Sequence, residues 1–350
     1  LHSSLIAFIV TLAVSLAGLT QVGAAEKTVK VFILAGQSNM EGKAKNELLD
    51  HQATPPATKK LCAHLRKDDS WIVRDDVSIK YLKRHGRLTV GYGSPGRTGV
   101  ELEFGNVVGD RFEEPVLLIK TAWGGKSLYR DFRPPSAGLP GKETLQEILE
   151  RTNEGNRKNN RPEITIDDIK ASYGRYYRDM ISNVTTTLSQ MGSHFPQLDG
   201  RDYEIAGFVW FQGWNDQYQD RWLTYEENMA NFIRDVRKEF RAPDMPFVIG
   251  QMGHDGMKPD KEGSPRDTIK KAQAAVPNYP EFKGNVLCVK TDKFWDMEAH
   301  AIYTGPGGWS KDVKKWRQFG NDHPYHYYGS PWCFAQIGTA FGEGMIELLK

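Results

Sequence analysis

Short apolar runs, each bounded by Gly, Pro or polar residues, alternate along this chain with longer stretches of helical spacing. Near-continuous apolar runs are typical of strands buried on both faces of a parallel sheet. The alternation therefore predicts an α/β fold of three layers, α/β/α, around a mainly parallel and roughly five-stranded sheet. The predicted strands are residues 29–34, 115–119, 205–211, 246–249 and 286–289, and the predicted helices are 99–112, 172–191, 225–240, 268–275 and 335–349.

Two long segments do not follow this alternation. Residues 43–98 are expected to form a small hairpin or cap after the first strand, and residues 126–170 a surface excursion after the second. Loops of this length in a compact domain are commonly functional, and both follow the carboxyl end of a strand. We therefore expect residues 26–350 to form one domain whose two insertions border the active site.

The beginning of the chain has the pattern of an export signal. Residues 4–18 form an uncharged apolar run, and the small residues that follow, up to Ala25, suit a cleavage site. The run is short for a membrane span. We expect residues 1–25 to be a signal peptide and the protein to be secreted or periplasmic, without stable membrane association after cleavage.

Composition excludes some classes of partner and site. The 46 basic and 44 acidic residues give a formal charge of +2, which argues against nucleic-acid binding. No Cys/His spacing of the metal-binding type is present, so neither a metal nor a cofactor is expected.

Cys288 lies in an apolar run and is expected in the core, whereas Cys62 and Cys333 are candidates for one disulfide that sequence cannot establish.

Four polar pieces lie at strand ends or just before the last helix. In a parallel sheet the carboxyl ends of the strands meet at one edge, where chemistry gathers, so these pieces are expected to converge. They are Gly36-Gln37-Ser38-Asn39, Thr121-Ala122-Trp123-Gly124-Gly125, Gln212-Gly213-Trp214-Asn215-Asp216 and Asp322-His323-Pro324-Tyr325-His326.

Together the pieces supply the parts of an acyl-transfer site. Such a site needs a nucleophile, a base, an acid that orients the base, and donors to the oxyanion. Ser38 is the candidate nucleophile, His326 or His323 the base, and Asp322 the nearest acid. The Gly125 backbone N–H and the Gln212 side-chain amide are candidate oxyanion donors.

Other interpretations of these residues remain open. Gly36 and Gly42 do not have the spacing of a phosphate loop, and the serine turn lacks the second glycine of the Gly-x-Ser-x-Gly elbow. Trp214 is either core filling or a platform that stacks on a sugar. Asp216 either caps a helix start or serves as the orienting acid.

The four pieces resemble the sequence blocks of the SGNH-hydrolase superfamily, in particular its sialate O-acetylesterase and acetylxylan esterase branch. Gly36-Gln37-Ser38-Asn39-Met40 is similar to the nucleophile block, Gly124-Gly125 to the second block, and Gln212-Gly213 to the Gln-Gly-Glu block. Tyr325-His326-Tyr327 is similar to the histidine block. The resemblance covers nearly the whole mature chain and implies a flavodoxin-like arrangement of the sheet.

By this resemblance Ser38 is the nucleophile, His326 the base, and the oxyanion hole comprises the Ser38 and Gly125 N–H groups with the Gln212 amide. Two positions depart from the branch: Trp214 replaces its Glu, and the acid expected three residues before His326 is instead His323. Asp322, four residues before, is the candidate acid, with His323 and Asp216 as alternates in the site. The candidate substrate-binding residues are Gln37, Asn39, Trp123, Trp214 and Asn215.

The resemblance implies a serine esterase that removes acetyl groups from carbohydrate, of the sialate or xylan type, through an acyl-enzyme. Its partner is an acetylated carbohydrate. Two alternatives are a catalytically impaired carbohydrate-binding protein on the same scaffold and a lipid-type esterase of the same superfamily.

Overall fold

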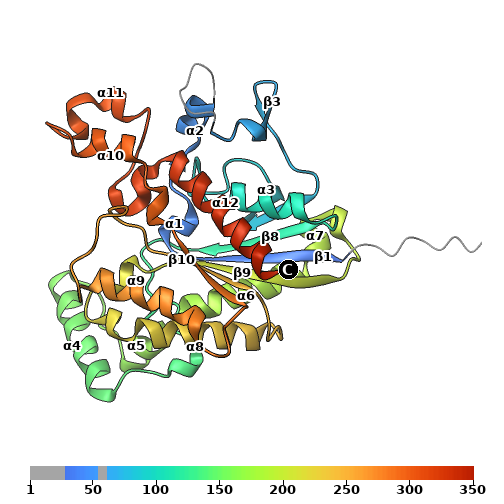
Figure 1. The fold of residues 1–350 in the computed structure, drawn as a ribbon. Helices are drawn as coiled ribbons and strands as arrows, with labels where there is room; N and C mark the ends of the chain where they lie inside the picture. The colour runs from blue at the N-terminus through green and yellow to red at the C-terminus, as the bar shows by residue number, and fades with distance from the viewer. Residues whose placement is uncertain (1–27, 54–60) are drawn as a thin grey trace, which may run out of the picture.

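The structure is a computed structural model that describes residues 28–53 and 61–350. A twisted sheet runs through its centre, and helices cover both faces (Figure 1). The predicted three-layer α/β fold is thereby confirmed. The predicted signal peptide lies outside the described residues. No helix among the described residues is both long and apolar enough to cross a membrane.

All five predicted strands are present in the central sheet. They are β1 (Val29–Gly36), β8 (Val116–Ala122), β9 (Tyr203–Phe211), β10 (Phe247–Gln251) and β11 (Val286–Lys290). Each pairs in parallel with its neighbours, and β1 lies between β8 and β9.

The sheet has seven strands, so the expected five was an undercount. Its order is β11-β10-β9-β1-β8-β5-β6. The additional strands, β5 (Val77–Tyr81) and β6 (Arg84–Arg87), come from the 43–98 insertion, where β5 pairs in parallel with β8 and β6 antiparallel with β5. β5 is buried at every residue and thus extends the core, which a cap would not do. The rest of the insertion holds the short strands β2 (Ala44–Lys45), β3 (Arg66–Lys67), β4 (Ser70–Trp71) and β7 (Arg97–Thr98).

Alternate side chains of the buried strands enter two separate cores. In β1, Phe32 and Leu34 join the core beneath α3 (Glu101–Arg111) and α12 (Pro331–Leu348), while Val31 and Ile33 join the opposite one. The opposite core is covered by α6 (Arg175–Ser189), α8 (Tyr225–Glu239) and α9 (Pro265–Ala275). These five helices match the five predicted ones to within a few residues. Successive residues of a strand thus point to opposite faces of the sheet, and both faces are apolar.

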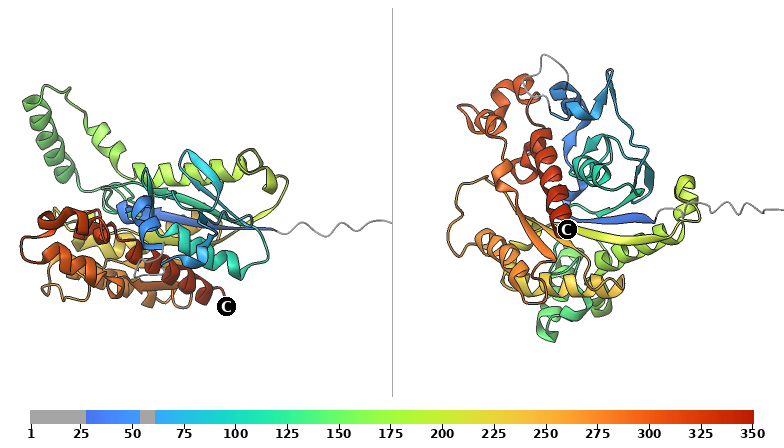
Figure 2. Two further views of the ribbon diagram at one scale, coloured as in Figure 1. Left: turned by 90° about the horizontal axis from the view of Figure 1, so that it is seen from above. Right: turned by 45° about the vertical axis from the view of Figure 1, so that its right-hand side comes forward.

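Helical excursions leave the carboxyl end of the sheet. The predicted excursion after β8 contains α4 (Lys142–Lys158) and α5 (Ile166–Ser172), which project from the body in the left view of Figure 2. A second one, after β11, contains α10 (Met297–Thr304) and α11 (Val313–Trp316), and the sequence analysis did not anticipate it. The remaining helices are α1 (Ser38–Glu41), α2 (Asn46–Ala53) and α7 (Met191–His194).

None of the three cysteines forms a disulfide in the structure. The candidate Cys62–Cys333 disulfide is therefore absent. Cys62 is buried and its Sγ donates to Glu103 Oε1 at 3.1 Å, so a local hydrogen bond holds it. Cys288, expected in the core, is only partly buried, and it packs against the core that α6, α8 and α9 cover.

Candidate active site

Ser38 is the first residue of α1, and only Gln37 separates it from the end of β1. Gly36, the last residue of β1, has φ +152°, and a Cβ there would lie 2.2 Å from the Phe211 carbonyl oxygen. Only glycine therefore lets β1 and β9 end so close together. Ser38 is 6% exposed. As the first residue of α1 it has a backbone N–H without an intrahelical acceptor, which is the kind of donor an oxyanion requires.

The segment that carries Ser38 contacts the loop that carries His326, although nearly the whole chain separates them. Asn39 Nδ2 donates to the Tyr325 carbonyl at 3.1 Å. Asn321 accepts from the Lys45 N–H at 3.1 Å and donates to the Lys43 carbonyl at 3.2 Å. The chain neighbours of both candidate residues are thus hydrogen-bonded to each other.

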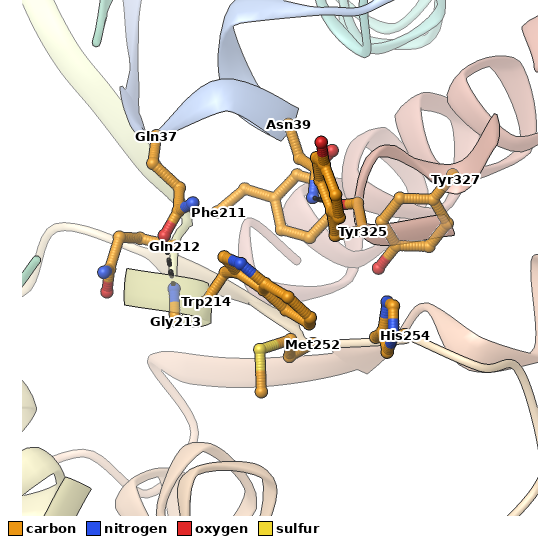
Figure 3. A pocket seen from close by; sticks show the side chains of 10 residues that line it. All are labelled: Gln37, Asn39, Phe211, Gln212, Gly213, Trp214, Met252, His254, Tyr325 and Tyr327. Carbon is orange, nitrogen blue, oxygen red and sulfur yellow. Dashed lines mark hydrogen bonds between the residues drawn. The ribbon is translucent and has the colours of Figure 1, made fainter. Parts of the chain in front are cut away.

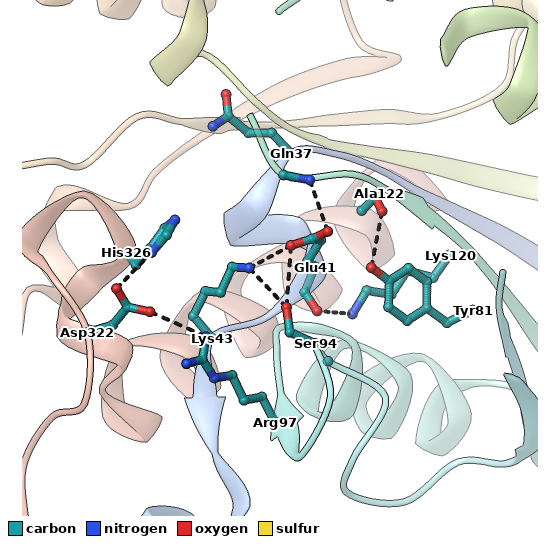
Figure 4. A network of polar contacts seen from close by, with 12 residues as sticks. Gln37, Glu41, Lys43, Tyr81, Ser94, Arg97, Lys120, Ala122, Asp322 and His326 are labelled. Atoms are coloured by element: carbon teal, nitrogen blue, oxygen red, sulfur yellow. Dashed lines mark hydrogen bonds and ion pairs between the residues drawn. The ribbon is translucent and has the colours of Figure 1, made fainter. Parts of the chain in front are cut away.

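His326 is paired with Asp322. Its Nδ1 lies 2.9 Å from Asp322 Oδ1, and Arg97 lies 3.4 Å from the other carboxylate oxygen (Figure 4). Burial raises the pKa of Asp322, but His326, the His323 N–H and Arg97 together lower it further, so the pKa lies below its ordinary value. Asp322 therefore stays ionised near neutral pH and holds the Nδ1 proton, which leaves Nε2 as the acceptor.

Ser38 Oγ and His326 share no hydrogen bond among the described contacts. Catalytic hydrogen bonds in unliganded sites are often long and tighten when substrate binds.

The histidine loop has an irregular backbone. Tyr327 and Tyr328 follow His326 with φ values of +51° and +60°, a region that bulky residues rarely occupy. Hydrogen bonds compensate for this strain: the Tyr327 hydroxyl accepts from the Gly253 N–H, and the Tyr328 carbonyl accepts from the Asp322 N–H at 3.0 Å. The backbone thereby closes on itself, so an acid four residues before the histidine still reaches the ring.

The two alternates in the site have other partners. His323 Nδ1 lies 3.0 Å from the Tyr303 hydroxyl, and its ring stacks on Tyr325. Asp216 is fully buried and accepts from the N–H groups of Leu128 and Tyr129, each at 2.8 Å. Burial raises the pKa of Asp216 to about 6 in spite of these donors. Asp216 has no described contact with the Asp322–His326 pair, whereas the His323 backbone contacts it: the His323 N–H donates to Asp322 Oδ1 at 2.8 Å, and the His323 carbonyl accepts from the His326 N–H at 2.9 Å.

The candidate oxyanion donors differ in availability. Gly125 has φ +72° and is exposed, and its N–H has no acceptor among the described residues. The side-chain amide of Gln212 instead donates to the Lys126 carbonyl at 3.0 Å and to Asp216 at 2.6 Å. Both of its protons are therefore engaged in this conformation, and Gln212 holds the turn after β8 against the turn after β9.

Glu41 was missed by the sequence analysis, although it lies three residues after Ser38. Its carboxylate accepts from Lys43 at 2.6 Å (Figure 4). It also accepts from the Gly124 N–H at 2.9 Å, so it ties the glycine turn to α1. The spacing of an acid one helical turn from the serine was the available signal.

A buried ion pair beneath α1 was also missed. Lys120 and Glu101 are fully buried and 2.7 Å apart. Lys120 also donates to the carbonyls of Glu41 and Tyr92, so all three of its protons have acceptors. The signal was a lysine inside the apolar run of β8, because a buried charge needs a partner.

Two of the substrate-binding candidates hold each other. Gln37 donates to Asn215 Oδ1 at 3.0 Å and accepts from the N–H groups of Gly213 and Asn215. Their polar groups thus fix the turn after β9. Trp123 packs edge-on against Tyr176 on the α6 side, with ring centroids 5.2 Å apart.

The other two candidates, Asn39 and Trp214, line a small pocket (Figure 3). The Trp214 ring lies 4.5 Å from that of His254 and 5.7 Å from that of Tyr325. Burial lowers the pKa of His254 to about 4, so its ring is neutral near pH 7. The pocket is mostly apolar and its volume of about 10 Å³ has room for one water molecule or a methyl group.

No group of three or more acidic, histidine or cysteine side chains suited to a metal ion occurs within residues 28–53 and 61–350.

Comparisons with known proteins bear on the fold and the family. A family model described as carbohydrate esterase, sialic acid-specific acetylesterase matches residues 28–304. The match includes Ser38, Gly125 and Gln212 and ends before the histidine loop. A comparison with curated proteins found no match.

Solved structures resemble the chain at low identity. A protein from Arabidopsis thaliana has 15% identity and a TM-score of 0.51, over 91% of this chain and 98% of that chain, and it shows a shared fold. A carbohydrate acetylesterase from Xanthomonas citri has 15% identity and a TM-score of 0.49, over 90% of this chain and 55% of that one. NanS has 13% identity and a TM-score of 0.41, over 76% and 78%. The last two scores are too low to carry an argument.

Proposed function

The chain belongs to the family of carbohydrate esterases described as sialic acid-specific acetylesterases, and from this premise we propose that it removes O-acetyl groups from carbohydrate through an acyl-enzyme on Ser38. The observation that carries the proposal is the Asp322–His326 pair in a loop whose Tyr325 carbonyl is bonded to Asn39, next to Ser38.

In the proposed first step, Ser38 Oγ attacks the acetyl carbonyl carbon and gives its proton to His326 Nε2. The carbonyl oxygen takes the electron pair and accepts from the N–H groups of Ser38 and Gly125. The bond to the sugar oxygen then breaks, and that oxygen receives the proton from His326. Asp322 stabilises the imidazolium in between. Water attacks the acetyl-serine in the same manner, and acetate leaves.

The pocket beside Trp214 supports a short acyl group. It lies between Gln37 and Asn39 on one side and Met252 on the other, and its volume admits a methyl group. A longer chain would have to displace Trp214 or Tyr325. We therefore expect acetyl esters to be hydrolysed much faster than octanoyl esters, which separates this proposal from a lipid-type esterase.

The decisive experiment replaces the nucleophile. Ser38→Ala should abolish acetate release from acetylated xylan, O-acetyl sialic acid and p-nitrophenyl acetate while the circular dichroism spectrum stays unchanged. A fluorophosphonate probe should label the wild-type protein and not the variant. The exposed Ser310→Ala is the matched control and should behave as wild type. Sugar binding without turnover or labelling in the wild type would instead identify a carbohydrate-binding protein that has lost activity.

Export is part of the proposal, because the apolar run of residues 4–18 and the small residues up to Ala25 have the pattern of a signal peptide. The test is expression of residues 1–350 in a secreting host and sequencing of the amino terminus of the released protein. Cleavage near Ala25 is expected, and intracellular retention of the uncleaved chain contradicts export.

A further inference from the structure

The turn after β8 contains three successive backbone N–H groups, of which the first two are hydrogen-bonded within the fold. The Trp123 N–H donates to the Gly36 carbonyl at 3.2 Å, at the end of β1. The Gly124 N–H donates to the Glu41 carboxylate at 2.9 Å. The Gly125 N–H, the candidate oxyanion donor, has no acceptor among the described residues. The available donor therefore follows directly after one that a carboxylate holds.

A second contact fixes the chain on the other side of Gly125. The Gln212 side chain donates to the Lys126 carbonyl at 3.0 Å. Gly125 itself has φ +72°, and a Cβ there would have no atom within 4 Å, so packing around this position does not hold it. A glycine backbone is also conformationally permissive. The direction of the Gly125 N–H therefore depends on the hydrogen bonds of its two neighbours, Gly124 and Lys126.

The backbone of Glu41 is itself fixed by two hydrogen bonds. Its N–H donates to the Gln37 carbonyl at 2.9 Å, and its carbonyl accepts from Lys120 Nζ at 2.9 Å. Lys120 is fully buried in β8, the strand that leads to the glycine turn. Glu41 thus connects the helix that begins at Ser38 with the strand that ends at this turn.

Lys43 and Ser94, which lie at opposite ends of the 43–98 insertion, compensate the charge of Glu41. Lys43 Nζ lies 2.6 Å from Glu41 Oε2, and the Ser94 hydroxyl donates to the same oxygen at 3.3 Å (Figure 4). The side chains of Glu41 and Lys43 are only 18% and 12% exposed, so solvent screens their charges weakly. The other carboxylate oxygen, Oε1, accepts from the Gly124 N–H.

This compensation matters because the oxyanion of the proposed reaction forms at the N–H of the next residue, Gly125. An uncompensated carboxylate beside a developing negative charge would raise the energy of the tetrahedral intermediate, since like charges repel. The Lys43 ammonium offsets that charge without occupying the oxygen that holds Gly124. Glu41 can therefore orient the turn without opposing the reaction.

We propose that Glu41 is a positioning residue for the oxyanion hole and that Lys43 neutralises it. Glu41 acts through the Gly124 N–H, which sets the direction of the Gly125 N–H, and not on the substrate. The inference rests on the proposed esterase function and adds to it two residues outside the nucleophile, base and acid. It also gives the 43–98 insertion a part in the reaction.

The first test removes the carboxylate. Glu41→Ala should lower kcat on p-nitrophenyl acetate about 10²-fold, the lower end of the cost of losing one oxyanion donor. KM should change little, because the donor acts in the transition state and not in substrate binding. Active-site titration with the fluorophosphonate probe counts the folded enzyme, so a loss of stability is not mistaken for a loss of kcat.

The second test separates position from charge. Lys43→Met should lower kcat about tenfold, since it leaves the Glu41 carboxylate uncompensated beside the oxyanion. The double variant Lys43→Met with Glu41→Gln should recover most of this loss. Its amide oxygen still accepts from the Gly124 N–H, its amide nitrogen can donate to Ser94, and no charge remains.

The control is the Glu154–Lys158 pair, which is equally short at 2.6 Å but exposed on α4. Glu154→Ala and Lys158→Met should each keep the kcat of the wild type. Wild-type kcat in Glu41→Ala would overturn the inference. So would a double variant no faster than Lys43→Met, a comparison that decides even if Glu41→Ala does not fold. Absence of p-nitrophenyl acetate hydrolysis in the wild type is a separate result, because it contradicts the esterase function itself.

Discussion

The two halves of the candidate active site are held by different means. The nucleophile turn is part of the sheet: Gln37, Ser38 and Asn39 are at most 8% exposed, and the Lys120–Glu101 pair lies beneath α1. The histidine loop lies outside the sheet, with the His326 side chain 18% exposed and followed by two tyrosines at positive φ. The comparison teaches that the serine is positioned by the core of the fold, whereas the histidine is positioned by local hydrogen bonds and aromatic packing.

The largest expected effect tests whether the two halves act as one unit. Ser38→Ala and His326→Ala should each lower kcat by a factor on the order of 10⁶, and the double variant should be no slower than either, because serine and histidine serve the same proton transfer. The measurement is kcat on p-nitrophenyl acetate. Multiplicative losses in the double variant would show that the halves work independently.

Asp322→Asn should lower kcat about 10⁴-fold, since an amide cannot hold the histidine proton in the orientation the reaction needs. KM should change little. His323→Ala is the matched control in the same loop, and we expect its kcat to remain near wild type because its ring contacts Tyr303 and Tyr325. A large loss of kcat in His323→Ala together with a small loss in Asp322→Asn would show that His323, and not Asp322, serves the reaction.

On the sheet side, Lys120→Met should destabilise the protein by about 3–5 kcal/mol, because Glu101 would remain buried without its partner. Urea unfolding measures this loss. The double variant Lys120→Met with Glu101→Gln should recover part of the stability. The control is Lys158→Met, whose partner Glu154 is on the exposed face of α4, and it should unfold as the wild type does.

The smallest effect concerns pH. The pKa of Asp216 is raised from 3.8 to about 6 in the folded protein, so its contribution to stability is full below about pH 4 and lost as pH rises through about 6. The loss amounts to about 3 kcal/mol for a shift of this size. The free energy of unfolding of the wild type should therefore fall relative to Asp216→Asn between pH 4 and 6. A constant difference across this range contradicts the raised pKa.

Much of the sheet was predictable because burial on both faces leaves a continuous apolar run. The five runs expected as strands are all strands, and Ser38 lies at the predicted strand end. The sequence analysis did not predict β5, because its run, Val77-Ser78-Ile79-Lys80-Tyr81, contains two polar residues that only the fold buries. The absent Cys62–Cys333 disulfide could not be decided from sequence either, since pairing depends on the distance between two distant segments.

By itself the sequence determined the three-layer class, the positions of the main strands along the chain and the identity of the polar pieces at their ends, because these follow from local patterns of burial. Only the tertiary structure decided the partners. It joined Asn39 to Tyr325 by a hydrogen bond, paired His326 with Asp322 and directed the Gln212 amide to Asp216. Such pairings depend on the register of the sheet and the path of long loops, which no local pattern encodes.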